Sequence, residues 1–303
     1  RIAEDIIQTP LIRLNIDDSS KEIFLKLENF QPTRAYKLRA ASNTIRLANK
    51  EQLENGVWTI SSGNFAQALA FIARKLNIGC KILVPDTIPQ DKEDSIIQLG
   101  AQVIKAPIEN AMNTLFTREY EGMEGLFIHP FSDPNVMAGS GTIGLEILDE
   151  LPDFDTVIIP WGGGGLSCGI ASAIRILKQD VKIYASEIDT CSPLAAAYKN
   201  DKIPDEIPYT PSFVDAIGYP FILPEMFALA KKLLDGSLVV GLEETADVIR
   251  LLAKRNCIVS EGAGALSIAA ALSQNIGKKI VCIISGGNID SLKLSKIMNG
   301  KIP

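Results

Sequence analysis

The chain has 303 residues, of which 47% are hydrophobic and only 6% are aromatic. This length allows one long domain or two of ordinary size, and the composition suits an α/β enzyme with a core of Val, Ile, Leu and Ala. The formal charge of −6 gives no basic footprint, so we expect no nucleic-acid partner. A negative charge also predicts neither an acidic substrate nor a membrane surface as partner.

The cysteines are scattered and form no CxxC pair. They are Cys80, Cys168, Cys191, Cys257 and Cys282. An odd number of widely separated thiols argues against a zinc site and favours a reducing compartment. The sequence begins with Arg1 and contains no evident signal peptide or spanning segment, so we expect a cytoplasmic protein.

Strand-like and helix-like runs alternate along almost the whole chain. The predicted strands are residues 23–27, 57–60, 81–84, 102–104, 126–128, 156–160, 181–185, 238–240 and 279–284. The clearest predicted helices are residues 38–47, 65–76, 166–177, 243–254 and 263–273. This alternation predicts an α/β fold with parallel sheets and helices on both faces.

The segment 56–131 reads as a βα layer of its own. We therefore expect a small domain, residues 56–131, inserted into a larger one formed by residues 1–55 and 132–303. The least regular stretch is residues 202–224, which is rich in proline. We expect it to form surface loops or the rim of an active site.

Lys37 opens a helix-like segment that follows a strand and a Pro-Thr turn. A lone lysine at such a place is usually solvated. Here the preceding strand would deliver it to the carboxyl edge of a sheet, where ligands bind in open α/β folds. Partial burial at that edge would help the amine to lose its proton, which a Schiff base requires.

Four consecutive glycines separate the predicted strand 156–160 from the helix after it. They are Gly162, Gly163, Gly164 and Gly165. Their backbone N–H groups can converge on an anion, and the dipole of the next helix adds to the attraction. A dinucleotide site is the main alternative, but its glycine spacing fails at Ser167 and Cys168. We therefore interpret the loop as a site for the phosphate of a small cofactor.

Two further loops come directly after predicted strands. Ser61, Ser62, Gly63 and Asn64 could simply cap a helix, or they could bind a substrate carboxylate while Asn64 hydrogen-bonds a phenolic oxygen. Ser285 begins a glycine turn and could face a pyridine nitrogen without holding it protonated. The lysine, the amide loop and the glycine loop together predict a covalent pyridoxal 5'-phosphate site.

Two further residues, His129 and Glu187, were considered as a catalytic residue and a metal ligand, and the sequence favours neither role. His129 is the only histidine, and no nucleophile-elbow sequence accompanies it, so we expect it to cap or pack beside Pro130. Metal-ligand spacing is approached only around Glu187, and we expect no metal.

These loops together resemble the fold type II pyridoxal phosphate enzymes, in the branch of threonine/serine dehydratases and serine racemases. The resemblance covers nearly the whole chain and implies a two-lobed fold with parallel-rich, twisted sheets. Besides the loops above, it is carried by Thr9-Pro10-Leu11, Lys26-Leu27-Glu28-Asn29, Gly141-Thr142-Ile143 and Glu261-Gly262-Ala263-Gly264-Ala265.

The resemblance also implies roles for individual residues. Lys37 would form the Schiff base and later move the Cα proton. Asn64 would contact the 3-hydroxyl of the ring and Ser285 its nitrogen, while Gly162 to Gly165 and Leu166 would hold the phosphate. Ser62 would lie on the ring face opposite Lys37. Racemases and hydroxyaspartate dehydratases of this branch carry serine there, whereas threonine dehydratases usually carry alanine.

Several positions depart from the family pattern. The usual Pro-Thr-Gly-Ser-Phe-Lys is Pro32-Thr33-Arg34-Ala35-Tyr36-Lys37 in this chain, and Phe65 replaces a histidine. Glu187 matches the first carboxylate of a divalent-metal site, but Pro193 stands where the second is expected. The resemblance therefore does not extend to that metal.

The leading hypothesis is an ammonia-lyase that converts threonine, serine or 3-hydroxyaspartate to a 2-oxo acid and ammonia. The alternative is a serine- or aspartate-type racemase that uses Lys37 and Ser62 as proton carriers. A β-replacement enzyme is less favoured, because such relatives carry Gly-Thr-Gly-Gly-Thr at the phosphate loop. The altered lysine motif also leaves open a relative that binds a ligand without chemistry. An acidic substrate would need a cation, for which Arg118 and Arg34 are candidates, and the resemblance implies a homodimer.

Overall fold

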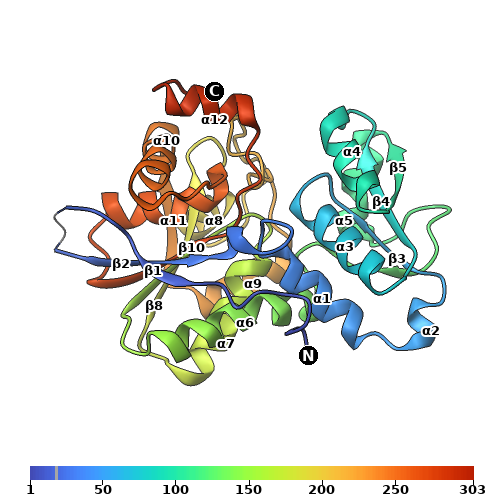
Figure 1. Ribbon diagram of the computed structural model, residues 1–303, viewed down its shortest axis with the longest axis horizontal. Coiled ribbons are helices and arrows are strands. Elements are labelled where there is room, and N and C mark those ends of the chain that lie inside the picture. Colours follow the sequence, from blue (N-terminus) through green and yellow to red (C-terminus); the bar gives the residue numbers. More distant parts are fainter. Residues whose placement is uncertain (18–19) are drawn as a thin grey trace.

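The computed structural model describes residues 1–17 and 20–303, whose strands form two sheets (Figure 1). Six strands form the larger sheet in the order β1-β2-β10-β7-β8-β9, and four form the smaller in the order β5-β4-β3-β6. Among the described pairings between these strands, only β1 with β2 is antiparallel. The predicted α/β fold with parallel-rich sheets is confirmed.

The larger sheet lies at the centre of the larger lobe. Its strands are β1 (Leu11–Arg13), β2 (Glu22–Leu27), β7 (Thr156–Pro160), β8 (Lys182–Ile188), β9 (Gly236–Val240) and β10 (Lys279–Ile284). Every residue of β7 is buried, as are Ile280 to Ile284 of β10. Strands covered on both faces are apolar throughout, which is why these runs could be read from the sequence.

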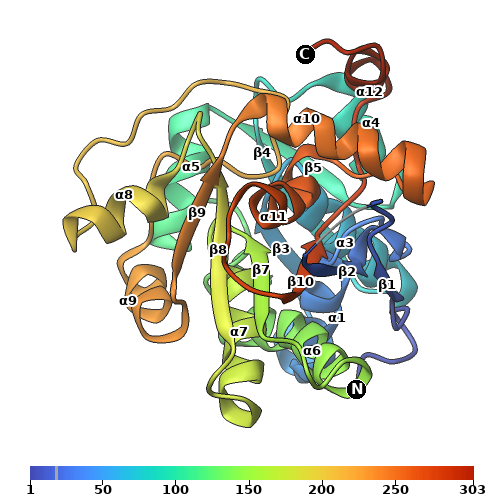
Figure 2. The same cartoon turned by 90° about the vertical axis from the view of Figure 1, so that its left-hand side faces the viewer.

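Helices cover both faces of this sheet, with α10 and α11 on one side and α6 and α7 on the other (Figures 1 and 2). The helices of this lobe are α6 (Pro134–Glu150), α7 (Gly165–Leu177), α8 (Pro193–Asn200), α9 (Pro224–Leu233), α10 (Leu242–Leu251), α11 (Gly262–Ser273) and α12 (Ser291–Met298), while α1 (Lys37–Leu47) packs both against α6 and against the helix Asn64–Lys75. A short 3-10 helix, Glu28–Phe30, comes after β2, and a π-helical turn, Leu252–Asn256, continues α10. No helix among the described residues has both the length and the apolar composition that crossing a membrane requires.

The smaller sheet is built from β3 (Val57–Ile60), β4 (Cys80–Pro85), β5 (Gln102–Ala106) and β6 (Leu126–Phe127). The helices that accompany it are α3 (Asn64–Lys75), α4 (Gln90–Gln98) and α5 (Ile108–Thr117), while α2 (Lys50–Leu53) precedes it. These elements lie at the right of Figure 1, apart from the larger sheet. All four strands fall within residues 56–131, although the domain boundaries themselves stay a prediction.

A buried ion network holds α1 against the larger lobe. Arg39 is fully buried, and its guanidinium contacts Glu28 at 2.8 Å and Glu146 at 2.5 Å. Lys26, also fully buried, contacts the other carboxylate oxygen of Glu146 at 2.8 Å. Buried charges need such compensating partners, because an uncompensated one is costly. The network joins β2, α1 and α6, and it therefore fixes the helix that begins at Lys37.

Candidate active site

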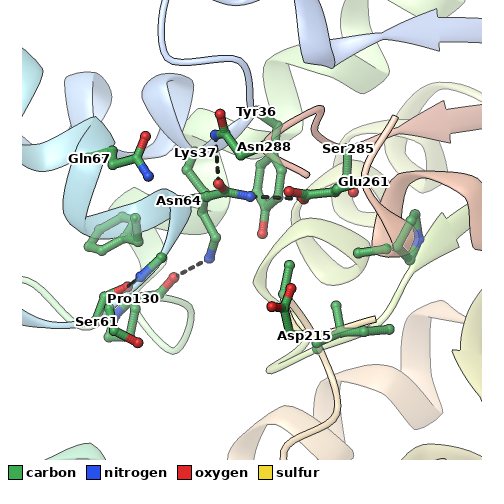
Figure 3. Close-up of a pocket in the computed structure, with 18 of the residues that line it drawn as sticks. Tyr36, Lys37, Ser61, Asn64, Gln67, Pro130, Asp215, Glu261, Ser285 and Asn288 are labelled. Carbon is green, nitrogen blue, oxygen red and sulfur yellow. Dashed lines mark hydrogen bonds between the residues drawn. The ribbon is translucent and has the colours of Figure 1, made fainter. Parts of the chain in front are cut away.

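A cavity of about 520 Å³ opens between the lobes, beyond the carboxyl ends of β3, β7 and β10 (Figure 3). The predicted site residues that line it are Lys37, Ser61, Ser62, Gly63, Asn64, Gly162, Gly163, Gly164, Gly165, Leu166 and Ser285. The segment between α8 and α9 is irregular, as predicted, and contributes Asp215 and Tyr219 to the lining. The structure thus brings all three loops and the lysine to one cavity.

The amine of Lys37 is held inside this cavity by one hydrogen bond and two aromatic rings. Nζ donates to the carbonyl oxygen of Pro130 at 2.7 Å. It lies 5.1 Å from the ring centroid of Tyr36 and 5.3 Å from that of Phe65. Burial lowers the pKa of Lys37 to about 7, because desolvation penalises the ammonium form. A substantial fraction of the amine is therefore neutral and nucleophilic near neutral pH.

The glycine loop presents backbone amides that no other described residue uses. No described residue accepts a hydrogen bond from the N–H groups of Gly162, Gly163 or Gly164, and the first amides of a helix such as α7 have no partner within the helix. Gly164 has φ +91°, a conformation that L side chains rarely adopt. The loop therefore suits an anion at the N-terminus of α7.

Asn64 begins α3, and its amide is held at both ends. Its Nδ2 donates to Oε1 of Glu261 at 2.9 Å, and its Oδ1 accepts from Nδ2 of Asn288 at 2.8 Å (Figure 3). Glu261 is only 5% exposed, and burial raises its pKa to about 7. In the sequence, Glu261 was named only within the run Glu261-Gly262-Ala263-Gly264-Ala265 and was given no role of its own.

The loop after β10 is joined by hydrogen bonds to the segment that carries the lysine. The amide of Tyr36 donates to the carbonyl oxygen of Ser285 at 3.0 Å, and the amide of Gly287 donates to that of Arg34 at 2.9 Å. Nδ2 of Asn288 also donates to the carbonyl oxygen of Thr33 at 3.0 Å. These contacts fix Lys37 and Ser285 relative to each other.

Three of the residues that depart from the family pattern, Arg34, Tyr36 and Phe65, line this cavity. Arg34 lines it, is exposed and has φ +58°. Among the described residues, its guanidinium has no ion pair or side-chain hydrogen-bond partner. Tyr36 directs its phenol into the space between Lys37 and Glu261 (Figure 3), and burial raises its pKa, so the phenol stays protonated.

Arg118, predicted as a substrate-binding residue, is not brought to the cavity. It ends α5, and its guanidinium contacts Glu225 at 3.1 Å and the hydroxyl of Ser132 at 3.2 Å. It is absent from the cavity lining, because the carboxylate of Glu225 and the hydroxyl of Ser132 hold it elsewhere. The structure therefore gives no support to a contact between Arg118 and the substrate.

Glu187 and His129 make structural contacts. Glu187 accepts hydrogen bonds from the amides of Leu194 at 2.8 Å and Ala195 at 2.7 Å, at the start of α8. Over residues 1–17 and 20–303, no group of three or more His, Cys, Asp or Glu side chains is arranged to hold a metal. Nδ1 of His129 accepts from the amide of Ser132 at 2.8 Å, so the histidine packs beside Pro130 as predicted.

Comparison with known proteins identifies similar chains. A model of the family described as "Pyridoxal-phosphate dependent enzyme" matches residues 2–286. L-threonine ammonia-lyase of Thermotoga maritima is 37% identical over 281 residues, which are 92% of this chain and 70% of that protein. The processed form of threonine deaminase isoform 2 from Solanum lycopersicum has a TM-score of 0.88 at 30% identity, covering 98% of this chain and 89% of its own. Maize serine racemase also has a TM-score of 0.88, at 31% identity, covering 99% and 94%.

Proposed function

The chain belongs to the family of pyridoxal-phosphate dependent enzymes, and we propose that it is an ammonia-lyase for a small β-hydroxy amino acid. The products would be a 2-oxo acid and ammonia, which together contain all the atoms of the substrate. The observation that carries this proposal is the buried Lys37 amine, with its pKa of about 7, in a cavity shared with the glycine loop and Ser62.

The residues of the cavity fit pyridoxal phosphate. Lys37 would supply the amine for covalent attachment, and the unpaired amides of the glycine loop, with that of Leu166, would bind the phosphate. Asn64 would hydrogen-bond the 3-oxygen through its nitrogen, since its oxygen is already occupied by Asn288. The hydroxyl of Ser285 would meet the ring nitrogen.

The bound cofactor supplies an electron-withdrawing ring that stabilises negative charge on the substrate's Cα. Lys37 would accept the Cα proton, because its lowered pKa leaves the free amine unprotonated often enough to act as a base. The amides and hydroxyls of Ser61 to Asn64, at the N-terminus of α3, would bind the substrate carboxylate. Ser62 could then donate a proton to the departing β-hydroxyl.

The substrate class rests on two kinds of support. The similar proteins described above include an L-threonine ammonia-lyase and a threonine deaminase, which makes threonine, and serine as its smaller analogue, the first candidates. Arg34 adds a cation to the lining of the cavity, and none of the described residues compensates it with an ion pair. An arginine without a protein partner suits a second carboxylate, so 3-hydroxyaspartate is the third candidate.

Racemisation is the second candidate function, favoured by Ser62. A racemase needs a proton carrier on each face of the substrate, and Ser62 lines the same cavity as Lys37. The similarity to maize serine racemase supports this alternative. Both reactions begin with removal of the Cα proton, after which a racemase returns a proton to Cα whereas a lyase expels the β-hydroxyl. They are therefore distinguished by product and not by substrate binding.

The deciding experiment measures two products from each substrate. The purified protein, loaded with pyridoxal phosphate, is incubated with L-threonine, L-serine and 3-hydroxyaspartate, and both 2-oxo acid and enantiomer composition are measured over time. We expect 2-oxo acid and ammonia in equal amounts from at least one substrate. Enantiomer exchange without 2-oxo acid would replace the lyase by a racemase. Cofactor binding without either product would support a relative that has lost its chemistry.

We further propose that the protein is a cytoplasmic homodimer. All five cysteines are free and four of them are buried, which suits a reducing compartment. Exposed apolar side chains near the end of α7, Ile176 and Leu177, are suited to contact with a second copy. Sedimentation equilibrium would test the dimer, and a single species with the mass of one chain would exclude it.

A further inference from the structure

Glu261 is a buried carboxyl group that faces the active-site cavity, and the proposed reaction does not use it. It lies immediately before α11, is 5% exposed and belongs to the cavity lining. A Cβ on Gly286 would lie 2.5 Å from its Oε1. The carboxylate is therefore packed directly against the loop after β10, and this loop leaves it little freedom to move.

The partner of Glu261 is the amide of Asn64, which cannot turn over freely. Nδ2 of Asn64 donates to Glu261, while its Oδ1 accepts from Asn288, whose Nδ2 is itself anchored to the carbonyl oxygen of Thr33. Turning the amide by 180° would place its oxygen against the carboxylate and its nitrogen against another N–H donor. Both contacts would be repulsive, so the orientation is fixed from two sides.

We propose that Glu261 is a positioning residue, which fixes the Asn64 amide so that its nitrogen faces the 3-oxygen of bound pyridoxal phosphate. An amide nitrogen has two N–H groups, and Glu261 uses only one of them. The second remains available to the cofactor. This inference rests on the cofactor of the family and on Asn64 as its contact, but not on the proposed reaction, so it can be tested without any substrate.

Several groups around Glu261 affect its charge. Burial, and to a smaller extent the charge of Asp215, raise its pKa, whereas hydrogen bonds from Asn64 and from the amide of Asn288, and the charge of Lys92, lower it. The net result is a pKa of about 7. The phenol of Tyr36 also faces it and stays neutral. As the pH falls below about 7, the carboxylate is protonated and becomes a weaker acceptor. The hold on Asn64 should then weaken.

A double-mutant cycle on cofactor affinity tests this inference. The variants are Glu261→Gln, Asn64→Ala and the double variant, and apoprotein is titrated with pyridoxal phosphate while visible absorbance is recorded. Each single change should weaken binding about 10-fold, the effect expected for one hydrogen bond to a charged group. If Glu261 acts through Asn64, the double variant should bind no more weakly than Asn64→Ala alone. Losses that simply add would overturn the proposal.

A cofactor analogue without the 3-hydroxyl group, 3-deoxypyridoxal phosphate, provides a sharper readout. The analogue has no 3-oxygen to accept a hydrogen bond from Asn64. Glu261→Gln should therefore leave the affinity for the analogue unchanged, while it weakens the affinity for pyridoxal phosphate. Equal weakening of both would show a merely structural role and overturn the proposal. In the wild type, the ratio of the affinities for pyridoxal phosphate and for the analogue should change with pH around 7. In Glu261→Gln this ratio should no longer depend on pH, and a pH dependence that remained would also contradict the proposal.

Two further variants keep the test interpretable. Glu187→Gln is the matched control, because Glu187 is also a buried carboxyl whose burial raises its pKa to about 7, yet it does not line the cavity. It should leave both affinities unchanged. If Glu261→Gln fails to fold, as judged by the unfolding temperature of its apoprotein, Asn288→Ala removes the other anchor of the amide. That variant should lose affinity only for the cofactor with the 3-hydroxyl, and unchanged affinity for both would overturn the proposal.

Discussion

The amine of Lys37 lies 2.7 Å from the carbonyl oxygen of Pro130, so it is held where the two lobes meet. Lys37 begins α1, which packs against both α6 and α3, whereas Pro130 comes shortly after β6 of the smaller sheet. This position buries the amine and lowers its pKa from 10.5 to about 7. The consequence can be measured in the protein before any cofactor is attached.

The rate of cofactor uptake should depend on pH in a specific way. Only the neutral amine reacts with the aldehyde of pyridoxal phosphate, so uptake by apoprotein should rise through pH 7 and level off above it. An ordinary lysine would show a rate still rising toward pH 10, because its amine remains mostly protonated below that pH. Stopped-flow absorbance after mixing at a series of pH values would measure this. Continued increase above pH 9 would contradict burial of the amine.

Replacement of Lys37 should abolish covalent attachment. Lys37→Arg keeps a cation beside Pro130 but cannot react with the aldehyde, so borohydride treatment should no longer add the cofactor's mass to the protein. Turnover should fall by about three orders of magnitude or more, as expected when an essential base is removed. Mass spectrometry and product assays would measure both effects. Lys50→Arg, at the start of the short helix α2, is the control and should behave like the wild type.

Ser62 separates the two candidate reactions. Ser62→Ala removes the hydroxyl without changing the backbone, so a racemase should lose enantiomer exchange by about 100-fold or more, because a general acid–base group has gone. A lyase would lose only the help that Ser62 gives to the departing β-hydroxyl, while Lys37 still removes the Cα proton, so it should keep appreciable formation of 2-oxo acid. Chiral chromatography and an oxo-acid assay on one sample would give both rates. The neighbouring Ser61→Ala variant shows what loss of a hydroxyl does elsewhere in the loop.

The sequence predicted most closely the strands that are apolar along almost their whole length. The run of residues 279–284 coincides with β10 because the sheet is covered on both faces. The three-residue strand β1, Leu11–Arg13, has no such run and was not predicted. The helix predicted over residues 243–254 ends as α10 at Leu251 and continues as a π-helical turn, a change of hydrogen bonding that leaves no mark in the pattern of apolar residues.

The site divides in the same way. Lys37 and Asn64 could be predicted because each comes soon after a strand in the sequence. The role of Glu261 depends on its hydrogen bond with Asn64, which is 197 residues away in the sequence. The position of Arg118 depends on its contact with Glu225, which is 107 residues away. Contacts of that separation are set by the fold as a whole, so neither could be foreseen from local sequence.

Arg34 should determine how well an acidic substrate is accepted. Arg34→Gly removes the cation at a residue with φ +58°, where glycine is favoured, so the fold should be as stable or slightly more stable. We expect kcat/KM for 3-hydroxyaspartate to fall about 10-fold or more, because a charged hydrogen bond is lost. The kcat/KM for threonine should change by less than about twofold, because threonine has no second carboxylate that Arg34 could contact. Arg118→Gln, outside the cavity, is the control, and an equal fall for both substrates would contradict the prediction.

Two neighbouring glycines should differ in their tolerance of alanine. A Cβ on Gly163 would lie 2.3 Å from Cγ of Phe131. Phe131 is only 3% exposed, and the centroid of its ring lies 4.5 Å from that of the His129 ring. The atom nearest to a Cβ on Gly162 would be Cγ2 of Ile217, at 3.2 Å. Because Phe131 has little room to move, Gly163→Ala should displace the glycine loop, whereas Gly162→Ala should need only a small shift of Ile217.

The displacement should be seen as a loss of phosphate binding. Overpacking costs about 1–3 kcal/mol, so Gly163→Ala should weaken binding of pyridoxal phosphate about 10-fold or more. Pyridoxal, which has no phosphate, should bind both variants almost as it binds the wild type. Titration of apoprotein with the two compounds would give the ratio of their affinities. An unchanged ratio in Gly163→Ala would mean that the amides of the glycine loop do not hold the phosphate, and the anion would then have to be sought elsewhere in the cavity.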